Sequence, residues 1–390
     1  MRIEFTEEQQ ALKGSLRALV RDKIAPRMPD IDETDEFPRD LWELFGELGL
    51  LQMVVPAEYG GGDAGCVDLC IVREELAKCS FAMAIVAHCN VIGGALALMV
   101  GANEDQKQRH LSRIGTGKTL SALALTEPSS GSDVAGMTTR AVRDGDDYVI
   151  TGRKAWASFT EVADIITVFA KTDMDAGLKG ITAFTLENGR HTPGLDIGKA
   201  EKKMGFHGVP SGEVGFDGVR VPLRDRIGEE GEGWSIAMRV LNRNRPVNAA
   251  GALGIAEGAF EYALRYVKER RVFGQSVSDF QGIQWMLADM ATEIECARGL
   301  VYRAAADVDA KVADTRELSS MAKRYATDVA MRVTTDCVQI MGAAGYTRAH
   351  PVERLMRDAK LTQIVEGANQ VQRNIIARNI LRRPQGRTWD

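Results

Sequence analysis

The sequence predicts an α+β protein of three parts: an all-α N-terminal domain over residues 1–120, an antiparallel β-sheet or barrel over residues 121–232, and a C-terminal four-helix bundle over residues 233–390. Two observations predict this division. Apolar residues recur at steps of three and four in the first and last parts, as on the buried face of a helix. The middle part instead has many glycines and short β-rich runs without intervening helical patterns, which excludes a βαβ domain.

The N-terminal domain opens with a capping box, in which the Thr6 hydroxyl and the Gln9 side chain each bond the other's backbone amide. Leucines follow at helical spacing, and Pro26 and Pro29 are expected to end this first helix. Further helices are predicted over 39–49, 68–79, 80–100 and 105–114.

In the middle domain, strands are predicted at 121–125, 148–151, 165–170, 181–186 and 212–216. Asp144-Gly145 and Asp217-Gly218 are typical of hairpin turns. In the C-terminal domain, apolar stripes over 241–270, 283–308, 321–341 and after 366 predict the bundle.

Composition sets limits on function. The net charge of −5 gives no reason to expect nucleic acid or an acidic membrane as a partner. The N-terminus lacks a signal-peptide pattern, and no apolar run is long enough to span a membrane. The six cysteines and five histidines show no metal-ligand spacing, so we predict no metal site and a cytoplasmic location with reduced thiols.

One candidate for chemistry is the loop at Glu366-Gly367, between two helical patterns. A carboxylate beside a glycine can be directed at a bound ligand, because glycine lets a ligand approach the backbone. Taken alone, the loop favours a helix-terminal glutamate in a surface turn.

A second candidate is the turn Thr126–Ser132, whose hydroxyls and free amides suit the polar edge of a flat heterocycle or a phosphate. Trp156 and Ser158 share one face of the following strand, and the indole suits stacking on a planar ring. The alternatives are a plain β-turn and a tryptophan in the barrel core. Arg270, at a helix end, suits a diphosphate, or simply the helix dipole.

Other nucleotide and hydrolase signatures are absent from the sequence. No Gly-x-Gly-x-x-Gly follows a strand, no Walker loop occurs, and Gly-x-Ser-x-Gly is missing.

Together these pieces resemble the acyl-CoA dehydrogenase family, including its short-chain, medium-chain and branched-chain members, over residues 3–382. The segments that carry the resemblance are 125–134, 154–158, 244–251, 269–274, 280–281, 339–342, 356–360 and 364–373. The resemblance implies FAD as cofactor and an acyl-CoA as substrate. It also implies the family's layout of a helical domain, a β-barrel and a helical bundle.

The resemblance assigns roles residue by residue. Glu366 would be the catalytic base that takes the α-proton, while the β-hydride passes to flavin and a trans-2-enoyl-CoA forms. The residues implied to bind FAD are Leu125, Thr126, Gly131, Ser132, Trp156, Ser158, Arg270, Phe273, Gln281, Gln339, Gly342, Ala368 and Gln370, of which Arg270, Phe273 and Gln281 would reach the FAD of a neighbouring subunit. The residues implied to line the CoA-thioester site are Ser132, Asn242, Arg245 and Gly367.

The chain departs from the family at three positions: Val365, where Tyr is common; Ala368, where Thr is common; and Ala343, where Gly is common. Some family members carry the base on the helix near Asn244, but no carboxylate occurs there, so Glu366 has no competitor.

The resemblance further implies electron-transferring flavoprotein as electron acceptor and a homotetramer or homodimer. Alternatives on the same scaffold are an oxidase, a decarboxylating dehydrogenase and a β-eliminating enzyme. A decarboxylating enzyme should carry a cation in the acyl pocket, and no Arg or Lys occurs over 80–103, although His88, Cys89 and Asn90 make that stretch polar. A non-catalytic helical interaction protein is the alternative from another class, and it would be colourless.

Overall fold

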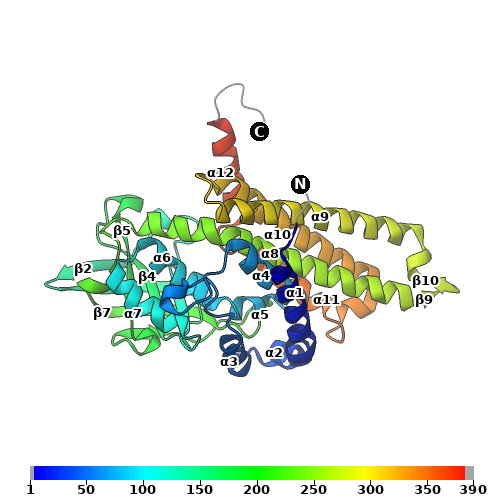
Figure 1. Ribbon diagram of the computed structural model, residues 1–390, viewed down its shortest axis with the longest axis horizontal. Coiled ribbons are helices and arrows are strands. Elements are labelled where there is room, and N and C mark those ends of the chain that lie inside the picture. The colour runs from blue at the N-terminus through cyan, green and yellow to red at the C-terminus, as the bar shows by residue number, and fades with distance from the viewer. Residues whose placement is uncertain (1–3, 383–390) are drawn as a thin grey trace.

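The structure, a computed structural model, describes residues 4–382 of the chain. A sheet domain lies at one end of the molecule and a bundle of long helices forms the other end (Figure 1). The first N-terminal helices pack beside the bundle, and the last two lie beside the sheet domain. The N-terminal helices are α1 Glu7–Leu19, α2 Met28–Thr34, α3 Arg39–Glu47, α4 Cys66–Ala77, α5 Phe81–Val86, α6 Leu96–Gly101 and α7 Glu104–Gly115.

The predicted capping box begins α1. The Gln9 amide donates to Thr6 Oγ1 at 3.2 Å, and the Thr6 amide donates to Gln9 Oε1 at 3.1 Å. The prediction that the prolines end this helix is wrong: a π-helical turn, Val20–Ile24, directly follows α1. Pro26 and Pro29 lie in the first turns of the next helical segments, where a missing amide hydrogen costs no intrahelical bond.

The single helix predicted over 80–100 is also wrong. It is divided into α5, a turn at 87–88, a π-helical segment Val91–Ala95, and α6. Buried Asn90 next to the break donates to the Thr119 carbonyl at 2.8 Å and accepts from the Ser121 amide at 2.7 Å. The break therefore coincides with a polar anchor that holds the start of the sheet domain.

The sheet domain has eight strands, and the prediction of a purely antiparallel sheet is wrong in part. Strand β1 pairs in parallel with β4, and β2 also meets β4 in parallel, while the other pairs are antiparallel. The long connection from β1 to β4 runs through the β2–β3 hairpin, which gives the crossover that parallel pairing needs. The strands, in the order β6-β7-β3-β2-β4-β5-β8 with β1 beside β4, are β1 Ser121–Ala124, β2 Arg140–Asp144, β3 Asp147–Ser158, β4 Ile165–Lys171, β5 Ile181–Leu186, β6 Leu195–Ile197, β7 Ser211–Pro222 and β8 Arg226–Ile227.

The two predicted hairpin turns have different outcomes. Asp144-Gly145 begins the tight connection between β2 and β3, as predicted. Asp217-Gly218 lies inside β7, so that prediction is wrong. Gly218 has a φ of 65° where the β3–β7 register shifts, so the left-handed residue makes a bulge instead of a turn.

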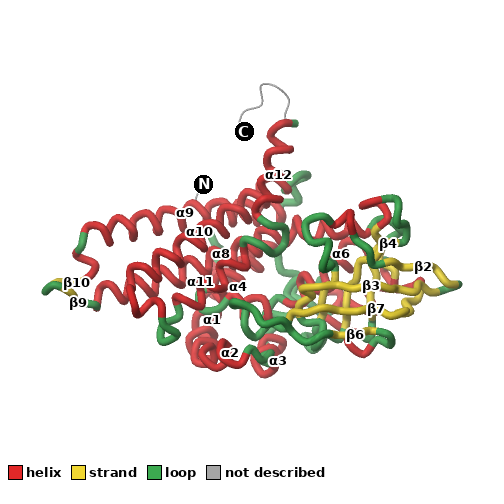
Figure 2. Tube along the Cα trace, turned by 180° about the vertical axis from the view of Figure 1, so that it is seen from behind, coloured by secondary structure: helices red, strands yellow, loops and turns green. Residues whose placement is uncertain are grey.

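The C-terminal helices are α8 Gly233–Glu269, α9 Gln281–Asp309, α10 Arg316–Met341, α11 Val352–Thr362 and α12 Asn369–Leu381, with a small hairpin of β9 Arg271–Val272 and β10 Gln275–Ser276 between the first two. Helices α8, α9 and α10 pack on one another, and α11 lies against α8 and α10. Helix α12 contacts α10 but projects from the body of the molecule, as Figure 2 shows. No helix within residues 4–382 is long and apolar enough to cross a membrane.

Candidate active site

Glu366 lies on the loop between α11 and α12, with a backbone conformation that L-residues rarely adopt. Its φ is 53°, and that of Gly367 is 90°. A Cβ added at Gly367 would come within 2.5 Å of Gln372 Nε2, so this position favours glycine for both space and conformation. Strained residues of this kind persist where surrounding contacts hold them, and they cluster at functional sites.

Three hydrogen bonds hold the loop in this shape. The buried amine of Lys323, on α10, donates to the Gly367 carbonyl at 2.9 Å and to Asn369 Oδ1 at 3.0 Å. Gln372 Nε2 donates to the same carbonyl at 2.9 Å. Burial lowers the pKa of Lys323 to about 8, and the charge of Glu366 opposes that shift.

The Glu366 carboxylate is held by one direct partner and by nearby cations. Asn244 Nδ2, on α8, donates to Glu366 Oε2 at 2.8 Å. Burial raises the pKa of Glu366 above its ordinary value, although the Asn244 hydrogen bond and the charges of Arg73, Lys323 and Arg245 act in the opposite direction. A carboxylate with a raised pKa, held in a fixed orientation, is suited to act as a general base near neutral pH.

The predicted thioester-site residues of α8 lie close in sequence to this contact. Buried Arg245 donates to Asn242 Oδ1, and burial lowers the pKa of Arg245 to about 10. The sequence analysis mentioned Asn244 only because no carboxylate occurs near it that could replace Glu366 as the base. In the structure its side-chain amide is the direct hydrogen-bond partner of the Glu366 carboxylate, and its place one residue before Arg245 was the available signal.

A cavity of about 430 Å³ opens beside Asn242. Basic side chains predominate in its lining: Arg239, Arg243, Lys311 and Arg316, against Asp309 and Asp314.

The turn Thr126–Ser132 is fixed from beneath by a buried ion pair. The Lys154 amine, on β3, donates to Glu127 Oε1 at 2.9 Å and to the Leu125 carbonyl at 3.0 Å. Glu127 also accepts from the amides of Thr138 and Thr139, at 2.7 and 2.9 Å. Sequence reasoning missed both partners of this pair, although Glu127 and Lys154 lie within the motifs that it quoted.

Burial alone would raise the pKa of Glu127, but the charge of Lys154 and the hydrogen bonds lower it to about 2. Burial lowers the pKa of Lys154 to about 8, against the attraction of Glu127. Both groups therefore carry charge at neutral pH. The turn leaves Thr126 partly exposed and Gly131 and Ser132 exposed above this pair.

Trp156 offers an open aromatic surface on the same strand as Lys154. Its side chain is 64% exposed, and its φ is 57°, at an irregularity in the β3–β7 register. The alternative of a barrel-core tryptophan is therefore excluded. Ser158, two residues on, shares a hydrogen bond of 2.8 Å with Ser211. An exposed indole beside hydroxyl groups and a turn with free amides fits a flat, polar-edged heterocycle such as a flavin.

The remaining predicted cofactor residues form no single cluster with Trp156 in this chain. Arg270, Phe273 and Gln281 surround the β9–β10 hairpin, at the opposite end of the molecule from the sheet (Figure 1). Phe273 at the hairpin tip is 95% exposed. Gln339 and Gly342 are exposed at the end of α10, and Ala368 and Gln370 begin α12 next to the Glu366 loop.

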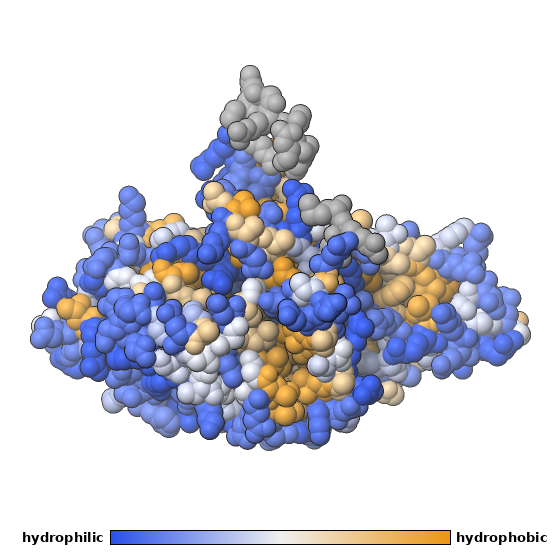
Figure 3. Space-filling model, in the orientation of Figure 1, coloured by the Kyte–Doolittle hydropathy of each residue, from blue (hydrophilic) through white to orange (hydrophobic). Residues whose placement is uncertain are grey.

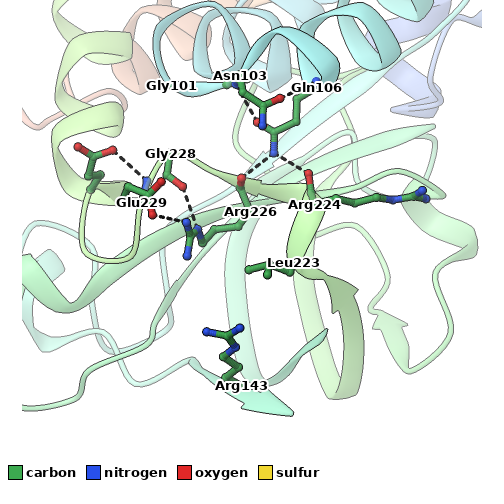
Figure 4. Close-up of a pocket in the computed structure, with 11 residues that line it drawn as sticks. Gly101, Asn103, Gln106, Arg143, Leu223, Arg224, Arg226, Gly228 and Glu229 are labelled. Carbon is green, nitrogen blue, oxygen red and sulfur yellow. Dashed lines mark hydrogen bonds and ion pairs between the residues drawn. The ribbon is translucent and has the colours of Figure 1, made fainter. Parts of the chain in front are cut away.

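A further pocket, of about 520 Å³, lies between the start of α7 and the segment around β8 (Figure 4). Its polar groups pair largely with each other: Gln106 Nε2 donates to the carbonyls of Arg224 and Arg226, and Arg226 pairs with Glu229. None of the predicted site residues lines it. We assign it no role.

Comparison with known proteins identifies the family. The acyl-CoA dehydrogenase N-terminal, middle and C-terminal domain models match residues 6–118, 122–219 and 231–381. Cyclohex-1-ene-1-carbonyl-CoA dehydrogenase from Syntrophus aciditrophicus is 44% identical over 97% of this chain and 91% of its own length.

Solved structures agree with the sequence comparisons. Butyryl-CoA dehydrogenase from Megasphaera elsdenii matches with a TM-score of 0.94 and 40% identity, over 98% of this chain and 100% of its own. A chain from a structure of the electron transferring flavoprotein of Acidaminococcus fermentans, solved towards a mechanism of flavin-based electron bifurcation, matches with a TM-score of 0.95 and 42% identity, over 98% and 100%. The predicted resemblance and three-part fold are thereby confirmed, and the chain belongs to the acyl-CoA dehydrogenase family, whose members are oxidoreductases.

Proposed function

We propose that this protein oxidises an acyl-CoA thioester to its trans-2-enoyl-CoA, using FAD as cofactor and Glu366 as base. The observation that carries the proposal is the Glu366 carboxylate: it has a raised pKa, a direct partner in Asn244, and a strained backbone fixed by Lys323. These features support a role for Glu366 as a base held at one fixed position.

Glu366 would remove the proton from the carbon next to the thioester carbonyl. That proton is only weakly acidic, so the carbonyl oxygen needs hydrogen-bond donors as negative charge develops on it. The Glu366 backbone amide is the donor expected from this chain by family analogy. Because burial raises the pKa of Glu366, its carboxylate binds a proton more readily than an ordinary carboxylate does.

FAD fits the turn Thr126–Ser132 and the open face of Trp156, and when bound it supplies the acceptor for the β-hydride. The CoA moiety fits the cavity beside Asn242, because its phosphates are anionic and the cavity lining is mostly basic.

The first test is the substitution Glu366→Gln. We expect the variant to keep yellow FAD but to lose flavin reduction by acyl-CoA by about 10²- to 10⁴-fold, as for removal of a general base. Anaerobic stopped-flow absorbance with a panel of acyl-CoAs measures the rate. Glu58→Gln, at an exposed glutamate, should reduce normally. Near-normal flavin bleaching in Glu366→Gln would contradict the proposal.

We further propose electron-transferring flavoprotein as the electron acceptor, supported by the structural neighbour from Acidaminococcus fermentans. Mixing reduced enzyme first with air and then with that flavoprotein separates a dehydrogenase from an oxidase. Rapid reoxidation by oxygen alone would favour the oxidase. Analysis of the product, as enoyl-CoA, a decarboxylated thioester or an eliminated fragment, separates the remaining reactions on this scaffold.

We also propose a homotetramer or homodimer, in which Arg270, Phe273 and Gln281 reach the FAD of a neighbouring subunit. Its support is the exposure of Phe273, at the tip of the β9–β10 hairpin, and of Trp285, near the start of α9. Figure 3 shows apolar surface on the bundle side of this face. Sedimentation equilibrium measures the state. A stable monomer that retains FAD would contradict this assembly.

A further inference from the structure

His207 lies where three parts of the molecule meet. It belongs to the segment between β6 and β7, and its ring Nδ1 lies 2.7 Å from the carbonyl oxygen and 2.9 Å from the Oδ1 atom of Asp32, on α2. Its Nε2 lies 3.1 Å from the carbonyl oxygen of Lys203. Arg357, on α11, donates to both carboxylate oxygens of Asp32, at 3.0 and 2.6 Å. One imidazole therefore links the N-terminal helices to the sheet domain, and Arg357 extends the link to the C-terminal helices.

These contacts require a protonated imidazole. The Lys203 carbonyl can only accept a hydrogen bond, so Nε2 of His207 must carry a hydrogen. Nδ1 faces the Asp32 carbonyl and an ionised carboxylate: burial acts to raise the pKa of Asp32, but the hydrogen bonds and charge of Arg357 lower it below its ordinary value. Nδ1 must therefore donate as well. Only the imidazolium form donates from both ring nitrogens.

Two carboxylates hold the backbone on either side of His207. Asp358, on α11, accepts from the Phe206 amide at 2.7 Å, and Asp35, at the end of α2, accepts from the Gly208 amide at 2.8 Å. Phe206 has a φ of 63°, a conformation that persists only where contacts hold it. The segment around His207 is therefore clamped between α2 and α11.

Charged groups on every element packed against His207 contribute to its surroundings. They are Asp32 and Asp35 on and at the end of α2, Lys203 on its own segment, and Glu353, Arg354, Arg357 and Asp358 on α11. Burial raises the pKa of Asp358 to about 6, so this carboxyl also ionises as the pH rises towards neutrality. That ionisation is common to every variant at position 207.

The same segment reaches the turn that carries Trp156. The Phe159 amide donates to the Pro210 carbonyl at 2.7 Å, and the hydroxyls of Ser158 and Ser211 share a hydrogen bond of 2.8 Å. Trp156 and Phe159 have φ values of 57° and 68°, so this turn depends on such contacts to keep its shape. A shift of the segment would therefore change the position of the indole.

We propose that His207 is a positioning residue for the flavin: in its protonated form it holds residues 203–211 against the Trp156 turn, and FAD binding weakens when that proton is lost. This role rests on the proposed flavin site at Trp156 and specifies how pH regulates that site.

The direction of the effect follows from the hydrogen bonds. When the imidazole loses a proton, one ring nitrogen presents a lone pair to an oxygen that can only accept, and the positive charge beside Asp32 disappears. The stabilisation by His207 is therefore present at low pH and is lost as the pH rises.

The first test measures how fast the holoenzyme releases FAD between about pH 5.5 and about pH 9, a range that spans the ordinary titration of histidine. The fluorescence of free flavin after dilution reports the release. For the wild-type protein, we expect release to become about 10-fold faster as the pH rises, because hydrogen bonds to a charged group are lost.

Three variants isolate the charge of His207. His207→Arg keeps a positive charge and several N–H donors, so its release of FAD should stay slow over the whole range. His207→Gln is uncharged at any pH, so it should release FAD about 10-fold faster than the wild type at about pH 5.5 and as fast as the wild type at about pH 9. His191→Gln, at an exposed histidine, should follow the wild type at every pH.

Hydrogen exchange measured by mass spectrometry distinguishes positioning from a general loss of stability. At about pH 9, residues 156–160 and 203–211 should exchange faster in the wild type than in His207→Arg at the same pH. Strands β4 and β5 should exchange equally in the two proteins.

The outcomes separate this role from the proposed flavin site. The role of His207 is overturned if the wild type and His207→Arg release FAD with the same pH dependence, or if exchange becomes faster throughout the sheet domain. Trp156→Leu tests the flavin site by itself: unchanged release of FAD from that variant would overturn the flavin site, and this role with it. If His207→Arg does not fold, His207→Gln decides the matter, because release equal to that of the wild type at about pH 5.5 overturns the role.

Discussion

The two halves of the proposed site treat their buried polar groups differently. Under the turn Thr126–Ser132, the Glu127 carboxylate receives donors from Lys154, Thr138 and Thr139. In the helical parts of the molecule, by contrast, Arg73 of α4, Asn248 of α8 and His88 in the turn after α5 keep buried atoms without partners in the described chain.

This difference indicates different roles. A satisfied network holds its surface rigid before any ligand arrives, as suits a cofactor that stays bound. Unsatisfied groups retain a desolvation cost that a substrate can relieve, and they select for substrates that do so. The Glu366 loop lies between these extremes: its backbone is pinned by Lys323, while its carboxylate has one direct partner, Asn244.

The largest expected effect comes from Lys154→Met, which removes the buried ion pair with Glu127 beneath the turn Thr126–Ser132. This leaves Glu127 as an uncompensated buried charge, so we expect a loss of about 3–5 kcal/mol in the free energy of unfolding. We also expect the turn Thr126–Ser132 to become less ordered and to bind FAD more weakly, because its support by Lys154 is lost. Denaturant unfolding of the holoprotein and its flavin absorbance measure both.

Lys171→Met is the matched control, because Lys171 is a buried lysine on β4 of the same sheet, and among the described residues it donates only to the carbonyls of Ala135 and Met174. We expect a smaller loss there. Pairing Lys154→Met with Glu127→Gln should recover part of the stability. Equal losses in the two lysine variants would show that the ion pair contributes nothing special.

A smaller effect is expected from Lys323→Met on the base loop. Two charge-assisted hydrogen bonds disappear, a change of about 2–4 kcal/mol, although Gln372 still donates to the Gly367 carbonyl. We expect a protein that still binds FAD but is reduced slowly by acyl-CoA, with kcat more affected than KM. Lys360→Met, at an exposed lysine of α11, should behave as wild type. Normal reduction kinetics in Lys323→Met would mean that Glu366 holds its position unaided.

The sequence predicted the features that depend only on residues close together in the chain. The Thr6–Gln9 box, the Asp144-Gly145 turn and the Glu366-Gly367 loop each depend on residues adjacent in the chain. Asp217-Gly218 misled the prediction because the same left-handed glycine serves a bulge as well as a turn, and only the partner strand β3 distinguishes the two.

Contacts between distant segments were beyond local patterns. Arg73, on α4, packs against Gly251 of α8, and these two segments lie far apart in the sequence. An arginine in an ordinary helical pattern therefore gave no sign of its burial. The role of Asn244 as a partner of Glu366 was hidden in the same way, because it depends on how α8 packs beside the loop after α11.

The smallest expected effect concerns that same contact and appears in the pH dependence of kcat/KM. The raised pKa of Glu366 means that activity falls, as the pH is lowered, at a higher pH than for an ordinary carboxylate, since the protonated form cannot accept the α-proton. The Asn244 hydrogen bond favours the ionised form, so Asn244→Leu should raise that pKa further and move the acidic limb upward by about one to two pH units. Asn244→Asp is not a useful comparison, because it adds a second carboxylate beside Glu366. Asn242→Leu is the better control, because Asn242 lies on the same helix but accepts a hydrogen bond from Arg245. It should leave the acidic limb of the pH profile in place and change KM instead. If the acidic limb does not move in Asn244→Leu, the Asn244 amide orients Glu366 without changing its pKa. The pKa of Glu366 would then be set by burial and the surrounding cations alone.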